Sequence, residues 1–210
     1  MGVTEHPMQA LAAFLPENSF EPVVQYIHQY KVHLTVTRKR KSVLGDFRHA
    51  AQNSNHRISI NGNLNIYEFL ITLLHELAHL LTFEQFGNRV DAHGKEWKLH
   101  YSRLLFDFVH RGIFPPDIEM ALQKSINNPA ATANGETELL LVLRKYDTRK
   151  KEDHFTVAEL PEGAVFALED GRVFKKGVKR RKRFECIELE TGHKYSFSPL
   201  SEVRMIVNGE

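Results

Sequence analysis

The apolar positions between Ile66 and Phe86 repeat with the period of a helix. At about 100° per residue its leucines form one stripe along a single side; they are Leu70, Leu73, Leu74, Leu77, Leu80 and Leu81. No proline or glycine interrupts the segment, Asn65 followed by Glu68 predicts an N-terminal cap, and Gly87 predicts the end. The pattern therefore predicts one long helix whose leucine stripe faces the core.

Shorter patterns surround this helix. The spacing of apolar residues predicts further helices before it, at 8–15 and 20–30, and after it, at 94–109 and, more weakly, at 118–126. Alternating or β-branched segments predict strands at 32–37, around Phe47 and at 57–61. Helices packed on a small sheet make an α+β domain, which we expect to cover residues 1–128.

The second part of the chain has a different pattern. Residues 129–137 are small and polar, as is typical of a linker. After it, we expect short strands at 139–143, 164–168, 184–190 and 194–197, separated by glycine-containing turns. The sequence thus predicts a small all-β domain at 138–210.

Composition narrows the class of protein. With 210 residues, 42% of them hydrophobic and 26% charged, the chain can bury one substantial core and a smaller one. The single cysteine, Cys186, excludes an intramolecular disulfide and fits a reducing cytosol. The start of the chain lacks a signal-peptide pattern, and the apolar stretch 69–83 is interrupted by histidines and a glutamate. We expect a cytoplasmic protein without membrane association.

The long helix contains His75-Glu76-Leu77-Ala78-His79, in which the two histidines lie nearly opposite the leucine stripe and Glu76 lies at the edge of the histidine side. Two histidines four residues apart on a helix point the same way and can bind one Zn²⁺, while the glutamate beside the first serves as general acid/base for water. A third ligand from elsewhere would leave one coordination position open, as a catalytic zinc requires. The motif indicates a zinc hydrolase, and most directly one that cuts peptide bonds.

The third ligand has several candidates. His93 lies fourteen residues after His79, and Asp91, Glu96 and His100 are close to it in the sequence. All of these side chains are of types that bind zinc, so spacing alone leaves the choice open.

The two histidine clusters resemble a known family. His75–Leu80 and His93–Trp97, together with Leu44–His49 and His56–Gly62 upstream, are similar to the SprT-like metalloproteases, relatives of the Spartan DNA-protein crosslink proteases. The resemblance covers about residues 8–118. It implies a zincin-like metalloprotease domain, one catalytic Zn²⁺ bound by the three motif histidines, Glu76 as the catalytic acid/base and a protein as the substrate; carried onto this sequence, the ligands are His75, His79 and His93.

The C-terminal part departs from that family. Several relatives carry a cysteine-bound zinc ribbon there, but one cysteine cannot build such a site. We therefore expect the β domain to fold without a second zinc.

A basic run in the β domain suggests a nucleic-acid partner. From Arg172 to Arg183 the chain has eight basic residues and no acid. Such a cluster is suited to phosphates of single-stranded or duplex DNA, with Phe174 and Phe184 stacking on unpaired bases; the residues expected to contact DNA are Lys175, Lys176, Lys179, Arg180, Arg181, Lys182 and Arg183. The alternative is a solvated loop balanced by nearby acids.

Residues 38–41, Arg-Lys-Arg-Lys, form a second candidate for phosphate contact. Their alternative role is to guard an exposed edge strand with charge.

Together these patterns predict a zinc metalloendopeptidase that acts on DNA-associated proteins. Two other functions stay open: a non-proteolytic nucleic-acid-associated protein with a structural zinc, and a zinc hydrolase of a non-peptide substrate. The sequence also leaves the oligomeric state open.

Overall fold

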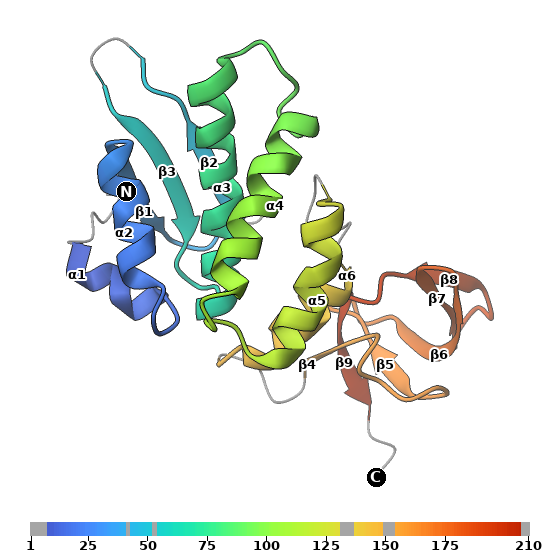
Figure 1. Cartoon of the computed structure of the whole chain (residues 1–210). Helices are drawn as coiled ribbons and strands as arrows, with labels where there is room; N and C mark the ends of the chain where they lie inside the picture. Colours follow the sequence, from blue (N-terminus) through green and yellow to red (C-terminus); the bar gives the residue numbers. More distant parts are fainter. Residues whose placement is uncertain (1–7, 41–42, 52–53, 131–136, 149–153, 207–210) are drawn as a thin grey trace. The chain divides into compact units, whose positions relative to one another are not determined.

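The computed structural model describes residues 8–40, 43–51, 54–130, 137–148 and 154–206 (Figure 1). The chain divides into two compact units, Met1–Asp147 and Thr148–Glu210. It is a mixed α and β protein, and each unit has its own sheet and its own buried core.

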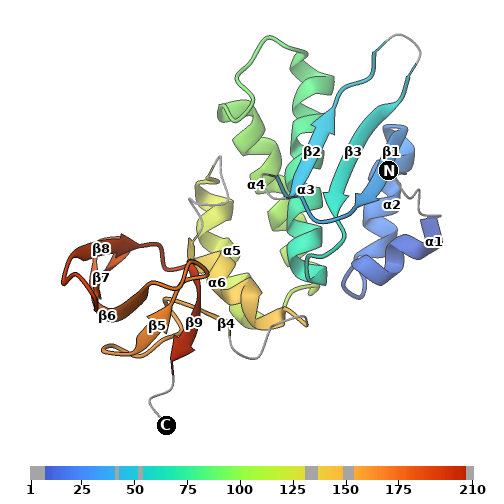
Figure 2. The same cartoon turned by 180° about the vertical axis from the view of Figure 1, so that it is seen from behind.

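The first unit contains a three-stranded sheet, visible in Figure 2. Its strands are β1 (Val32–Thr37), β2 (Gly45–Arg48) and β3 (His56–Asn61), and their order is β1-β3-β2. β3 pairs in parallel with β1 and antiparallel with β2, so β2 lies at one edge. The three predicted strands are confirmed.

Six helices belong to the described residues of this unit: α1 (Met8–Leu11), α2 (Phe20–Gln29), α3 (Ile66–Phe86), α4 (Lys95–Val109), α5 (Pro116–Asn127) and α6 (Thr137–Leu143). The long predicted helix is α3, and most of its leucine stripe is fully buried. The Asn65 side chain accepts a hydrogen bond from the Glu68 N–H at 2.9 Å, and Gly87 follows the last turn with φ of 61°. The two ends of α3 therefore lie at the capping residues that the sequence predicts.

α3 is long and apolar enough to cross a membrane, and it is the only such helix within the described ranges. However, 56% of its apolar window is buried inside the protein. It is packed as the central helix of a folded unit, which is consistent with a soluble protein.

One predicted strand is wrong. Residues 139–143 form most of α6, and Leu139 and Leu143 are buried in the core of the first unit. The predicted linker at 129–137 lies mostly outside the described residues, and the boundary between the compact units falls after Asp147. A run of five apolar residues fits a strand or a buried helix equally well, and tertiary packing selects the helix.

The second unit is a six-stranded antiparallel sheet, in agreement with the all-β fold that the sequence predicts for this part of the chain. Its strands are β4 (His154–Thr156), β5 (Val165–Ala167), β6 (Val173–Arg180), β7 (Arg183–Glu188), β8 (Lys194–Phe197) and β9 (Glu202–Ile206), in the order β4-β9-β5-β6-β7-β8. A small core that includes Phe166, Phe174 and Cys186 supports it. The basic run 172–183 covers β6, the turn after it and the first residue of β7, so most of it is strand and not a solvated loop.

Candidate metal centre

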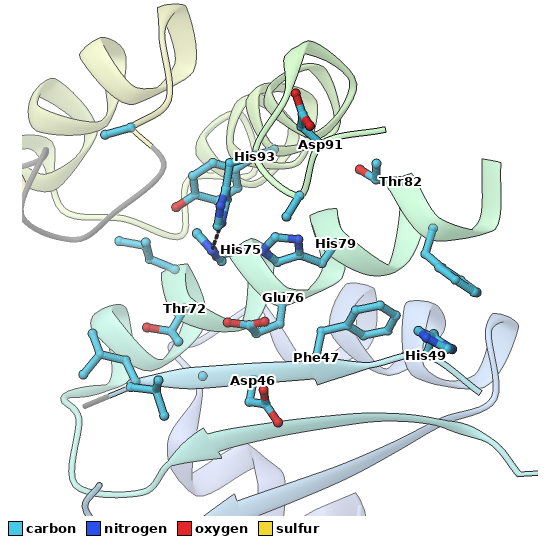
Figure 3. A pocket seen from close by; sticks show the side chains of 18 of the residues that line it. Asp46, Phe47, His49, Thr72, His75, Glu76, His79, Thr82, Asp91 and His93 are labelled. Carbon is cyan, nitrogen blue, oxygen red and sulfur yellow. Dashed lines mark hydrogen bonds between the residues drawn. The ribbon is translucent and has the colours of Figure 1, made fainter. Parts of the chain in front are cut away.

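Three imidazoles from separate parts of the first unit converge at one point (Figure 3). His75 and His79 project from one face of α3, and His93 comes from the segment between α3 and α4. Their ligand nitrogens all lie within 4.8 Å of one another, and the Nε2 atoms of His75 and His93 are 3.3 Å apart. Zinc bonds of about 2.0–2.1 Å in a tetrahedron place two nitrogens about 3.3–3.4 Å apart. The donor set therefore fits a zinc ion.

Aromatic side chains from α4 hold these imidazoles in place. Trp97 is fully buried, and its ring centroid lies 4.7 Å from those of both His75 and His93. Tyr101, also buried, packs 5.4 Å from His75. These contacts with α4 restrict the rotamers of the histidines.

Burial keeps the three histidines neutral. Desolvation lowers the pKa of His75 to about 3, with smaller contributions from His79 and His93. Desolvation and the nearby His93 lower the pKa of His79 to about 4, and desolvation also lowers the pKa of His93. Neutral imidazole is the form that binds a metal, so the site is ready to bind at physiological pH.

The other three candidates for the third ligand are not part of this cluster among the described residues. Glu96 lies 3.8 Å from the ammonium of Lys95. His100 is 3.0 Å from the side-chain oxygen of Gln85. Asp91 lines the same cleft but contributes no atom to the group of ligand nitrogens.

The carboxyl group of Glu76 is buried beside the histidines. Strand β2 covers it: a Cβ added to Gly45 would stand 2.6 Å from Oε1 of Glu76. Burial, and then the charge of Asp46, raise the pKa of Glu76 to about 8, while Arg40 and the backbone N–H of Phe47 act in the opposite direction. Glu76 can therefore exchange a proton near neutral pH, as a general acid/base must.

Arg40 has a structural role that the sequence did not predict. Its guanidinium donates hydrogen bonds to Oδ1 of Asn61 at 2.8 Å, to Oγ of Ser59 at 2.9 Å and to the Leu44 carbonyl at 3.3 Å. These bonds hold the segment before β2 against β3. The Arg40 side chain thus stabilises the fold through these hydrogen bonds and does not serve as a phosphate contact. Lys41 lies outside the described residues.

The site lies in a cleft of about 1020 Å³ between α3 and β2. The Leu44 carbonyl accepts a hydrogen bond from the Asn61 N–H on β3 at 2.9 Å. Because backbone groups alternate in direction along an antiparallel strand, those of Gly45 and Phe47 face the free edge of β2. Because the Phe47 N–H already donates to Glu76, the groups of this edge that the cleft offers for hydrogen bonding are those of Gly45 and the carbonyl of Phe47.

The second unit carries the basic cluster. Six of the seven predicted contact residues are exposed on β6, on the turn or at the start of β7: Lys175, Lys179, Arg180, Arg181, Lys182 and Arg183. Asp170 pairs with Arg172 and Glu185 pairs with Lys194, so these two acids are engaged away from the tip of the hairpin.

Lys176 and Phe174 do not fit the prediction, and the half-buried Phe184 packs against the core of the unit. Lys176 is buried, donates a hydrogen bond to the Leu160 carbonyl, and lies with its Nζ 4.2 Å from the centre of the Phe184 ring. Phe174 is fully buried in the core. The alternation of β6 points residues 174 and 176 inward, which removes them from any surface that binds DNA.

Comparison with known proteins agrees with this geometry. Residues 16–119, which contain the whole histidine cluster, match the model of the SprT-like family. Proteins named Protein SprT are similar over short stretches: 42% identity over 50 residues in Pseudomonas putida, covering 21% of this chain and 30% of the relative, and 40% over 48 residues in Pseudomonas fluorescens, covering 22% and 24%. These matches thus span less than a third of the relatives' length, and no solved structure was found to match. By its sequence over residues 16–119, the chain belongs to the SprT-like family.

Proposed function

We propose that the chain is a zinc-dependent metalloendopeptidase with a zincin-like first unit. One observation carries this proposal: three neutral histidines converge beside a buried carboxyl group in an open cleft. Membership of a metallopeptidase-like family supports it. His75, His79 and His93 would hold the metal, which when bound would polarise a carbonyl and lower the pKa of water.

Glu76 would carry the proton. Its carboxylate accepts a proton from a water molecule in the cleft and then donates that proton to the leaving amine. The Phe47 N–H and the close backbone of Gly45 hold the carboxyl in one position. Because its pKa is raised to about 8, both of its protonation states are accessible near neutral pH.

An extended polypeptide is the substrate that this cleft suits. A peptide can add to the free edge of β2 through the backbone groups of Gly45 and the carbonyl of Phe47, which requires no particular side chain. Such pairing would lay the peptide across the cleft, over Glu76 and the histidines. A small non-peptide substrate would leave this edge unused.

The basic hairpin would bring the protease to proteins on DNA. Its six exposed cations are suited to phosphates, and phosphate contacts do not depend on base sequence. With Phe174 buried, stacking on bases is no longer part of this proposal. We further propose that the protein acts in the cytoplasm, in accordance with its one buried, reduced cysteine.

Zinc content and cleavage, measured on the same samples, test the proposal. The wild-type protein should hold one zinc and cleave an unfolded protein such as casein, with loss of cleavage on chelation and recovery when zinc is added. His75→Ala, His79→Ala and His93→Ala should each lose tight zinc binding, whereas the control His100→Ala should keep it. Zinc without any proteolysis would favour a structural zinc; hydrolysis of esters or amides but not peptides would favour the non-peptide alternative.

A further inference from the structure

The cleft continues from the metal centre toward α6 and ends at an apolar wall with one carboxyl group. Ile71 of α3 and Leu140 and Leu143 of α6 line this end together with Glu68. α6 lies after residue 119, outside the residues that match the family.

Glu68 is a carboxyl group in an unfavourable environment. Burial, and then the negative charge of Asp147, raise its pKa to about 7. Asp147 itself accepts a hydrogen bond from the Asn65 side chain at 2.8 Å. Among the described residues, neither carboxylate forms an ion pair with a lysine or arginine. A cation arriving from outside would relieve both the burial and the repulsion.

The position of Glu68 matches the path of a bound peptide. Glu68 lies on the histidine face of α3, seven residues before His75 and therefore about 10 Å from it along the axis. An extended peptide advances about 3.3 Å per residue, so a long side chain one or two residues from the scissile bond can span this distance. Its methylene groups would pack on Ile71, Leu140 and Leu143, as the stems of lysine and arginine do on apolar surfaces.

We propose that this end of the cleft is a specificity subsite for a lysine or arginine side chain of the substrate. The assignment rests on the proposed peptidase activity, because it names the substrate that the same cleft prefers. An apolar substrate side chain would fill the leucine wall but would leave Glu68 buried without a partner. The basic side chain satisfies both parts of the subsite.

A mixed peptide library tests the subsite, with cleavage positions read by mass spectrometry. The wild-type protein should cut peptides with lysine or arginine at one fixed position near the scissile bond at least about ten-fold faster, in kcat/KM, than matched peptides with norleucine there. Glu68→Gln should lose this preference and still cut the norleucine peptide. Glu17→Gln, which makes the same charge change at an exposed position, should keep it. A preference for leucine, or an unchanged basic preference in Glu68→Gln, would overturn the subsite while leaving the peptidase intact.

A binding measurement decides the subsite independently of hydrolysis. Fluorescence anisotropy of a labelled lysine peptide and its norleucine twin is measured on the Glu76→Gln protein. The lysine peptide should bind about ten-fold more tightly, and adding Glu68→Gln should remove the difference. Equal binding of the two peptides would refute the subsite. A clear lysine preference without hydrolysis in the wild-type protein would support the subsite and reject the peptidase.

Discussion

Gly45 on the edge strand and Glu76 on α3 are packed so closely that residue 45 has no room for a side chain. A Cβ there would stand 2.6 Å from Oε1 and 2.9 Å from Cγ of Glu76. The same Cβ would also lie 2.9 Å from Cγ2 of Thr72. The absence of a Cβ thus lets β2 lie against the carboxyl group of Glu76, so the strand that borders the cleft also fixes the position of this side chain.

Gly45→Ala should therefore damage catalysis more than folding. The added methyl must displace either the Glu76 carboxyl group or β2. A correctly positioned general acid/base typically contributes about 10²–10⁴-fold to the rate, so its displacement should lower the rate by up to that factor. Zinc content should be unchanged, since the three atoms nearest to the added methyl belong to Glu76 and Thr72 and not to the histidines. Steady-state kinetics, zinc analysis and a thermal melt on one preparation check this. Full activity in Gly45→Ala would show that the close packing has no role in positioning Glu76.

Zinc affinity should be insensitive to pH over a wide range. A histidine must be neutral to bind zinc, and a lowered pKa means that protons compete only at lower pH. Burial lowers the pKa of all three histidines, to about 3 for His75 and to about 4 for His79, so protons should displace zinc only at pH values below the usual range of histidine. Competition with a chelator, corrected for the chelator's own protonation, measures this. A loss of affinity centred near 6.5 would mean that the histidines are solvated and not preorganised.

The sequence was sufficient where the signal is local. All the signals for α3 lie within about twenty residues: the helix period, the Asn65 cap and the pair of histidines. The sequence therefore predicted α3 correctly, with both histidines on it. The third member of the histidine cluster was not decided by spacing, because Asp91, Glu96 and His100 have suitable chemistry. Only the packing of α4 on α3, with Trp97 behind the imidazoles, brings His93 and not its neighbours to the site.

Non-local packing also explains the errors. Residues 139–143 form an apolar run that lies in a helix whose Leu139 and Leu143 pack into the core of the first unit. Arg40 looked like a surface cation, yet its partners on β3 are about twenty residues away in the sequence. Lys176 could have been separated from the other cations by the strand period, since it shares an inward face with Phe174. That pattern was masked by the density of charge around it.

The basic hairpin should give DNA binding that weakens steeply with salt. Each neutralised phosphate contributes a slope of about −0.9 on a log–log plot for duplex DNA and about −0.7 for single strands. Replacing Arg180, Arg181 and Lys182 with glutamine should therefore flatten the slope by roughly two to three units. Glutamine at Arg57, Arg103 and Arg111, three exposed cations of the first unit, is the matched control and should change it little. Equal effects of the two triple variants would assign DNA binding to net charge, not to the hairpin.

Replacement of the buried Lys176 should affect stability and not DNA binding. Its ammonium donates hydrogen bonds inside the β unit and contacts the Phe184 ring. Lys176→Ala should lower the free energy of unfolding by about 1–3 kcal/mol, because the Leu160 carbonyl loses its donor. Urea unfolding measures this loss, and the salt slope measured on the folded variant should match the wild type. A flattened slope with unchanged stability would place Lys176 on the DNA-binding surface after all.

Glu76→Gln provides the most direct measurement of the central claim, that a metal held by three histidines and a neighbouring carboxyl together hydrolyse peptides. Glutamine keeps the shape of the side chain but cannot accept the proton from water, and it adds no change to the imidazoles. Zinc content and the rate of peptide cleavage are measured on the same sample of the variant and of the wild type. The account predicts one zinc per chain in both proteins and a cleavage rate at least about 10²-fold lower in Glu76→Gln. Cleavage at the wild-type rate by the zinc-loaded variant would contradict it.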